Sequence, residues 1–224
     1  MDFGMAFGFV FQDKDWLRKV LIVALVSLIP IIGQLVVLGW GLNVTRRVMA
    51  RDPQPLPDLD FGNDLARGFQ AFVIGLVYAL PIILISGIFG LLGSLLGIDS
   101  GNTSDAVGAI YLLFSLCFGL FSLVYGVFLA LALPAAYANF LAKGSLGAGL
   151  NFGEVFRLVR AAPGAYLLVL VGSFIVGLIA PLGVILCFVG VLLTYAYGMA
   201  VMGHLYGQAY NQALQNLGVG ATPA

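Results

Sequence analysis

The chain has 224 residues, of which 61% are hydrophobic and 9% are charged, and its 10 basic and 10 acidic residues cancel to zero net charge. A soluble protein carries about 25% charged residues, so this composition excludes an ordinary water-soluble domain. It indicates that much of the protein's surface contacts the lipid bilayer. The absence of a basic face also removes the electrostatic basis for a nucleic-acid partner.

Long stretches of the chain contain no Asp, Glu, Lys or Arg, namely residues 20–45, 68–98, 106–142 and 161–224. A spanning helix needs about 20 apolar residues, and every stretch meets that length. The alternation of membrane β-strands is absent, and helices are the other way to satisfy the backbone in hydrocarbon. The sequence therefore predicts an all-α polytopic transmembrane bundle, with one membrane domain over residues 1–212 and a flexible tail over residues 213–224.

Basic residues cluster around positions 14–19, 46–67 and 143–160, between the apolar stretches. Short loops rich in Lys and Arg stay cytoplasmic. If all three clusters lie on that side, each apolar block between them must enter the membrane and return. We therefore expect three helical hairpins, over residues 17–48, 69–142 and 164–210, with far-side turns at 27–33, 99–105 and 181–183.

The first hairpin allows two interpretations. Its first arm, residues 17–29, is short for a full crossing at about 1.5 Å per residue. Residues 17–48 form either a pair of short re-entrant helices or one long kinked span. The single span would put the basic residues at its two ends on opposite sides of the membrane, so the charge rule favours the re-entrant pair.

An amphipathic segment precedes each predicted hairpin, at residues 3–16, 58–68 and 150–162. Segments with one apolar and one charged face tend to lie in the headgroup plane, and Asn151 with Glu154 fits a helix-capping box. The three copies suggest a repeat, although any helix that enters a membrane tends to be amphipathic. The expected interfacial anchors are Trp16, Phe61, Phe152, Arg157 and Arg160.

The chain contains 30 glycines, and in membrane bundles small residues let helices approach closely. Several glycines stand four positions from another small residue, a spacing that places both on one helical face. The predicted helix-packing glycines are Gly93, Gly97, Gly119, Gly126, Gly203 and Gly207.

The apolar stretches contain a single imidazole and no other side chain with evident chemistry. Charged side chains at the bilayer centre mark proton and ion pathways, so their absence from the apolar stretches argues against a pump or a proton-coupled transporter. Motifs for zinc, nucleophilic catalysis and phosphate binding are absent, and we expect no enzyme activity, no metal site and no cofactor. His204 is interpreted as a hydrogen-bonded interfacial residue. The alternative is an axial ligand of a porphyrin-type cofactor, with Gly203 and Gly207 leaving room for the macrocycle.

Four segments carry a family resemblance: residues 11–19 with Asp-Lys-Asp-Trp, the turn at 27–33, the Arg-Arg to Pro-Leu-Pro stretch at 46–57, and the closing 202–210. Together they resemble a prokaryotic membrane-protein family, domain-of-unknown-function family 4013. The resemblance implies a multi-helix bacterial or archaeal membrane protein, and it brings no catalytic or binding residues.

The functional expectation is a non-catalytic scaffold or accessory subunit, in a homo-oligomer or with other membrane-protein subunits. The alternative is a channel or transporter for a small neutral or lipidic molecule, because prolines inside the apolar stretches fit discontinuous spans. The expected location is the cytoplasmic membrane of a prokaryote, with multiple crossings and the basic loops in the cytoplasm.

Overall fold

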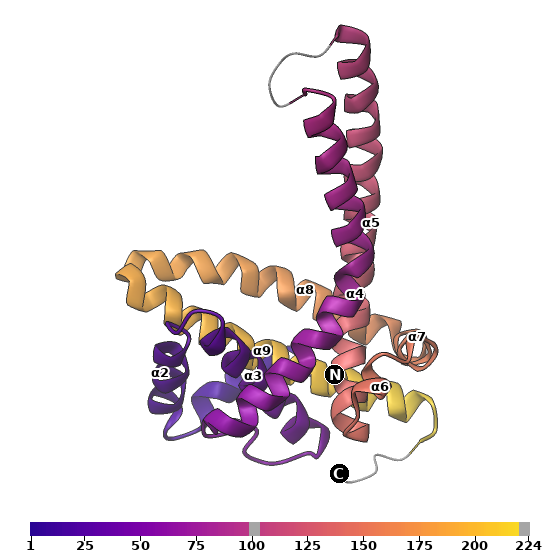
Figure 1. The fold of residues 1–224 in the computed structure, drawn as a ribbon. Coiled ribbons are helices and arrows are strands. Elements are labelled where there is room, and N and C mark those ends of the chain that lie inside the picture. Colours follow the sequence, from indigo (N-terminus) through magenta and orange to yellow (C-terminus); the bar gives the residue numbers. More distant parts are fainter. Residues whose placement is uncertain (99–103, 220–224) are drawn as a thin grey trace. The chain divides into compact units, whose positions relative to one another are not determined.

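The computed structural model of the chain describes residues 1–98 and 104–219, without the side chains of residues 180 and 185–189. Over these residues the chain is helical and has no strand (Figure 1), which confirms the predicted all-α class. The elements in chain order are α1 (Phe3–Gly8), η1 (Phe9–Gln12), α2 (Trp16–Val26), α3 (Ile32–Met49), α4 (Phe61–Leu95), α5 (Asp105–Lys143), α6 (Leu146–Gly149), α7 (Phe152–Ala161), α8 (Pro163–Ile179), η2 (Ala180–Leu186) and α9 (Cys187–Asn216).

Three segments of the described chain are long and apolar enough to cross a bilayer: Phe61–Leu95, Asp105–Lys143 and Pro163–Val184. The shortest has 22 residues and measures about 33 Å at the α-helical rise, against a hydrocarbon core of about 30 Å. The protein is thus a helical membrane protein. Its three-hairpin arrangement stays a prediction, and residues 99–103 of the second far-side turn lie outside the described residues.

The chain divides into two compact units. Unit 1 comprises Met1–Ile74 and Leu131–Ala224, and unit 2 comprises Gly75–Ala130. Unit 1 contains the shorter helices and the Pro-rich connector after α3. Unit 2 contains the C-terminal part of α4 and the N-terminal part of α5.

The centre of unit 1 is α3, whose residues 36–45 are almost all buried. It packs along α9 and against the start of α4. A methyl group at Gly39 would overlap the backbone of Asp64 in α4, and a methyl group at Gly203 in α9 would overlap the carbonyl oxygen of Gly41. Glycine is therefore required at these crossings, because only a missing side chain brings the helix backbones so close.

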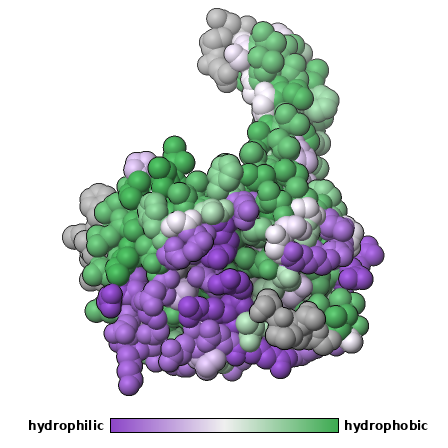
Figure 2. Space-filling model, turned by 60° about the horizontal axis from the view of Figure 1, so that its bottom comes forward, coloured by the Kyte–Doolittle hydropathy of each residue, from purple (hydrophilic) through white to green (hydrophobic). Residues whose placement is uncertain are grey.

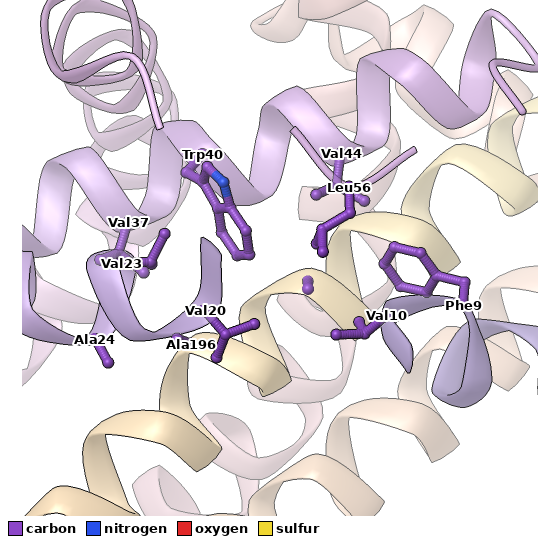
Figure 3. Close-up of a cluster of buried hydrophobic side chains, with 11 residues drawn as sticks. Phe9, Val10, Val20, Val23, Ala24, Val37, Trp40, Val44, Leu56 and Ala196 are labelled. Atoms are coloured by element: carbon purple, nitrogen blue, oxygen red, sulfur yellow. The ribbon is translucent and has the colours of Figure 1, made fainter. Parts of the chain in front are cut away.

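A buried hydrophobic cluster joins α3 to the N-terminal helices, the connector after α3 and α9 (Figure 3). Trp40 is the largest fully buried side chain in it, and its indole Nε1 donates to the Pro57 carbonyl over 3.1 Å. The Pro-rich connector is thereby held against α3. The members of the cluster are Phe9, Val10, Val20, Val23, Ala24, Val37, Trp40, Val44, Leu56, Ala196 and Ala200.

The first apolar block forms two separate helices, α2 and α3, and not one long helix. The turn between them includes Ile31 at a positive φ of 63°. A methyl group at Gly33 would overlap the Val26 carbonyl, so the chain reverses tightly there. With 11 residues, α2 measures about 16 Å, half the thickness of the hydrocarbon core. The length of α2 fits a helix that does not cross the bilayer, whereas α3 has 18 residues and measures about 27 Å. That the two helices form a re-entrant pair stays a prediction.

The surface of unit 1 is divided by polarity. Figure 2 shows hydrophilic residues gathered on one side of this unit, with hydrophobic residues beside them. The exposed charged residues include Lys14, Arg18, Arg46 and Arg51 of the N-terminal helices and the connector. On the exposed surface of α8, by contrast, large apolar side chains such as Phe174 dominate. This division is typical of a protein that lies at a membrane surface.

Unit 2 is a pair of helical arms from α4 and α5 that run beside each other (Figure 1). The rings of Phe89 and Tyr111 pack with centroids 5.2 Å apart, and the Tyr125 hydroxyl donates to the Tyr78 carbonyl over 2.7 Å. Elsewhere the arms are exposed, because only 11% and 6% of the most apolar windows of α4 and α5 are buried. Lipid or another protein must cover such apolar surfaces.

Two element boundaries differ from the sequence-based expectation. Residues 61–68 of the predicted interfacial segment form the first turns of α4, which continues unbroken to Leu95. At the other end, α9 continues to Asn216, with Ala213 fully buried, so the first residues of the predicted tail are part of the fold. Residues 220–224 of that tail lie outside the described residues.

Candidate functional site

His204 lies on the part of α9 that packs against α3. Gly203 faces the Gly41 carbonyl of α3, and a methyl group at Gly207 would come within 2.9 Å of the Thr45 carbonyl oxygen. The two glycines therefore give no room to a macrocycle, since α3 fills the space beside them. The room for a ligand at His204 lies toward the N-terminal segment that precedes α2.

The imidazole of His204 is 3% exposed and stacks on Phe9, with ring centroids 4.4 Å apart. Its Nδ1 lies 3.0 Å from the Gln208 side-chain nitrogen. The Gln208 amide also makes two bonds to the backbone of Asp2: its Oε1 accepts from the N–H over 2.8 Å, and its Nε2 donates to the carbonyl over 2.9 Å. This pairing fixes the amide orientation, so Nδ1 accepts and the proton of the neutral imidazole is on Nε2.

A cavity of about 540 Å³ adjoins His204 in unit 1. Its wall includes five carboxamide side chains and the charged residues Asp2, Arg51 and Asp52, together with apolar groups from the N-terminal segment and the connector. The lining residues are Met1, Asp2, Met5, Phe9, Gln12, Val48, Arg51, Asp52, Pro53, Pro55, His204, Gln208, Asn211, Gln212 and Gln215.

The cavity offers hydrogen bonds more than charge. Two carboxylates and one guanidinium line it, so it has no strong preference for an anion. Carboxamides both donate and accept, and the Nε2–H of His204 has no hydrogen-bond partner among the described residues. Nowhere in residues 1–98 and 104–219 do three or more His, Cys, Asp or Glu side chains group to hold a metal ion. The arrangement suits a small neutral polar group.

Comparison with known proteins assigns the chain to a family. The family model described as "Protein of unknown function (DUF4013)" matches residues 22–202, which is more than half of the chain. The chain belongs to this family. Neither a curated protein nor a solved structure matches it. The matched range contains α3 to α8 and all of unit 2, whereas the N-terminal segment, His204 and Gln208 lie outside it.

The predicted packing glycines have three kinds of surroundings in this family member. Gly203 and Gly207 lie against α3, as described above. In unit 2, a methyl group at Gly93 would lie 2.5 Å from the Tyr111 hydroxyl of α5, and Gly97 ends α4 at a positive φ of 70°. Gly119 and Gly126 have no atom within 4 Å of a Cβ position. Their role in helix packing therefore stays a prediction that needs a neighbour outside this chain.

The predicted interfacial anchors begin helices or lie on the surface of α7. Trp16 begins α2 and meets Phe11 edge-on at 5.0 Å. Phe61 and Phe152 are the exposed first residues of α4 and α7. Arg157 and Arg160 are exposed on α7, and the structure brings them together in one groove with Gly153, Phe156, Ala161 and Leu217.

The sequence analysis did not find the buried ion pair at the start of α4. Asp64 is fully buried, and its carboxylate accepts from the Arg67 guanidinium over 2.8 Å and from the Asp60 backbone over 3.0 Å. The spacing of three residues between Asp64 and Arg67 was the available signal. Because α3 covers Asp64 through Gly39, burial of the pair depends on a contact that no local pattern encodes.

Glu154 connects α7 to the end of α5. Both carboxylate oxygens lie 2.6 Å from Lys143 Nζ, and Asn139 donates to one of them over 3.0 Å. These hydrogen bonds hold the pKa of Glu154 below its ordinary value. The Asn151 side chain accepts from the Glu154 backbone, which is the N-cap half of the predicted capping box. The Glu154 side chain does not complete the box. Its carboxylate binds Lys143 and Asn139 of α5 instead.

Asp13, near the N-terminus of the chain, also forms an ion pair that connects two parts of unit 1. Burial raises the pKa of Asp13, but hydrogen bonds from Lys19 and from the Asp15 backbone outweigh burial, and the pKa falls below its ordinary value. Lys19 Nζ lies 2.7 Å from Asp13 and 3.0 Å from the Leu56 carbonyl. This lysine therefore joins the N-terminal segment to the connector after α3.

Proposed function

We propose that this protein is a non-catalytic scaffold or accessory subunit of the prokaryotic cytoplasmic membrane, in a homo-oligomer or with other membrane-protein subunits. The observation that carries the proposal is the exposed small-residue face of α5 in unit 2. Gly119 and Gly126 stand seven residues apart on that face with no neighbouring atom. In unit 1, Gly39 and Gly203 hold helices together at close crossings.

Periodicity identifies the face. Residues seven apart lie almost above one another on a helix, so Gly119 and Gly126 share one side of α5. Exposed Cys117 and Val124, which are also seven apart, lie on the opposite side. A neighbouring helix that packs on the glycine side would gain close backbone contact, as small residues allow in membranes. A chain that only met lipid would gain nothing from glycine there.

The proposed orientation places the basic loops in the cytoplasm. The exposed cations Lys14, Arg18 and Arg51 belong to the N-terminal helices and the connector, on the segments between apolar blocks. Such segments stay on the cytoplasmic side. Single-cysteine labelling at positions 14 and 51 tests the orientation, with labelling expected from the inside only. Labelling from opposite faces would contradict it.

The assembly is tested on protein extracted from its own membranes in polymer-bounded nanodiscs, without detergent. The particle mass should correspond to a homo-oligomer or to a stoichiometric complex. The double substitution Gly119→Leu/Gly126→Leu should shift that mass to a monomer, because it fills the proposed contact face.

Val124→Leu serves as the matched control, since it enlarges a residue on the opposite side of α5, and the mass should not change. The helical content of the glycine variant should not fall, because a Cβ at either position meets no atom of the chain within 4 Å. A monomeric wild-type particle, or an unchanged assembly in the double variant, would contradict the proposal.

A second candidate is a channel or transporter for a small neutral or lipidic molecule, and the cavity at His204 favours it. The discontinuous spans expected at the prolines give it less support, because α4 and α5 continue as helices through Pro81 and Pro134. Flux of a neutral polyol into liposomes is the test. Flux above that of empty vesicles, reduced by His204→Phe, would replace the scaffold proposal by this one.

A further inference from the structure

Helix α7 lies on the surface of unit 1 with aromatic and basic side chains facing outward. Val155 and Leu158 are buried and hold the helix on the unit, whereas Phe152 and Phe156 are 50% and 43% exposed. Exposed aromatic rings beside arginines are typical of helices at the depth of the lipid headgroups. The outer side of α7 is therefore suited to contact headgroups directly.

A groove of about 360 Å³ runs along this side of α7. Residues of α7 line it together with Leu217, which follows the end of α9. The wall is fixed, because the Asn216 side chain donates to the Ala161 carbonyl over 2.8 Å. The groove is thus built by two elements and does not depend on a single helix face.

The charges in the groove are unbalanced. Arg157 and Arg160 line it, and no carboxylate does. The nearest carboxylate on α7, Glu154, is held by Lys143 at 2.6 Å. Neither arginine forms an ion pair within the described residues, whereas Lys19 and Arg67 each do.

The groove also has an apolar component. The Arg160 guanidinium lies over the Phe156 ring, 5.3 Å from the ring centre. This cation–π contact orients the guanidinium. Its N–H groups, which lie at the edge of the plane, stay available for an acceptor. Phe156 and Leu217 then provide apolar contact next to the two cations.

We propose that this groove binds the phosphate headgroup of an anionic phospholipid. Guanidinium groups match phosphate oxygens in a two-pronged geometry, and a bound phosphate would relieve the repulsion between the two arginines. Phe156 and Leu217 favour an amphiphile over a free ion, because they would contact the glycerol and the first acyl carbons. The inference is independent of the scaffold function.

The experiment measures lipid binding to the full-length protein by native mass spectrometry, with phosphatidylglycerol competing against phosphatidylcholine. Each basic residue near an anionic surface contributes about fivefold in affinity. Arg157→Gln/Arg160→Gln should therefore reduce the phosphatidylglycerol preference about 25-fold. The charge-conserving Arg157→Lys/Arg160→Lys should keep most of that preference but lose the part that depends on two-pronged bonding.

The matched control is Lys14→Gln/Arg18→Gln, which removes the same charge from exposed residues of another segment. It should leave the preference unchanged. Equal loss in the control would show a general charge effect and overturn the proposal, as would an unchanged preference in Arg157→Gln/Arg160→Gln. A second arm adds inorganic phosphate at millimolar concentration. If phosphate displaces the lipid and binds in the same arginine-dependent way, the site is one for free phosphate and the lipid proposal fails.

Discussion

In unit 1, Gly39, Gly68 and Gly203 lie against the backbone of a neighbouring helix, whereas in unit 2 Gly87, Gly119 and Gly126 have no atom within 4 Å of a Cβ position. The same residue type thus has two kinds of surroundings in one chain. The three unit 1 glycines close helix crossings around α3. The three unit 2 glycines leave helix surfaces available to lipid or to another protein. The polar interactions are also divided between the units: the ion pairs of the described residues and the His204 cavity belong to unit 1.

The largest expected effect comes from breaking the buried ion pair of unit 1, which Asp64 forms with Arg67. Arg67→Leu leaves the carboxylate of Asp64 buried without its cation, which costs roughly 3–5 kcal/mol. Chemical denaturation in nanodiscs measures the loss. Lys143→Leu removes the cation of the more exposed Glu154 pair and should cost less than about 1 kcal/mol. Adding Asp64→Asn to Arg67→Leu should recover much of the loss, and equal costs for the two single variants would contradict the importance of burial.

The glycine comparison is tested by one added methyl group in each unit. Gly68→Ala forces the new Cβ into the Leu35 carbonyl of α3, and overpacking of this kind costs about 1–3 kcal/mol. Gly87→Ala meets no atom and should be neutral, or stabilising by about 0.5–1 kcal/mol, because alanine favours a helix more than glycine does. Unfolding temperatures of the two variants decide the matter. A similar decrease in both would remove the distinction between the units.

The sequence predicts those parts of the fold that depend on local composition. The charge-free stretches predicted α4 and α5, and the spacing of Gly203 and Gly207 predicted a packing face on α9. The partner of that face was not predictable, because Gly41 lies in another apolar stretch with no distinguishing pattern. The Gly39–Gly68 crossing was missed for the same reason. Neither glycine has a characteristic spacing, and their proximity results from the way α3 and α4 meet.

The candidate site was predicted only in part. His204 stood out as the single imidazole of the chain, but its surroundings did not. Gln208 binds the backbone of Asp2 from a position 206 residues away, and backbone groups carry no sequence signal. The glycine spacing predicted room for a ligand, but α3 fills that space. Such long-range contacts cannot be predicted from local sequence patterns.

A smaller effect concerns how the N-terminal segment is held on unit 1. Gln208→Ala removes both hydrogen bonds to Asp2, and each is worth roughly 0.5–1.5 kcal/mol. Hydrogen–deuterium exchange of residues 1–12 should accelerate about tenfold, the factor that corresponds to 1.4 kcal/mol. Gln215→Ala, in the same cavity wall but on an exposed residue, should change nothing. Unchanged exchange in the Gln208 variant would mean that other contacts hold the segment, such as the Phe9 ring on His204 and the hydrogen bond from the Tyr197 hydroxyl to the Phe7 carbonyl.

The smallest effect is the pH dependence that Glu154 contributes. Its pKa is depressed in the folded protein, chiefly by the Lys143 hydrogen bond, so the folded state binds the proton less readily than the unfolded state does. The stabilisation is therefore complete above the ordinary value of 4.5 and is lost as the pH falls through the lower folded-state pKa. The pair is partly exposed, so the loss should stay below about 1 kcal/mol.

Thermal unfolding as a function of pH measures this contribution, with Glu154→Gln as the variant that lacks it. The pKa of Asp13 is also depressed in the folded protein. Protonation of Asp13 and protonation of Glu154 should therefore each lower the stability of the wild type at acidic pH. The contribution of Glu154 is the part of that loss that Glu154→Gln does not show. If the two curves are parallel, the Lys143 contact does not stabilise unit 1, and α7 is held by its other contacts, which include buried Val155 and Leu158 and the Asn216 hydrogen bond to Ala161.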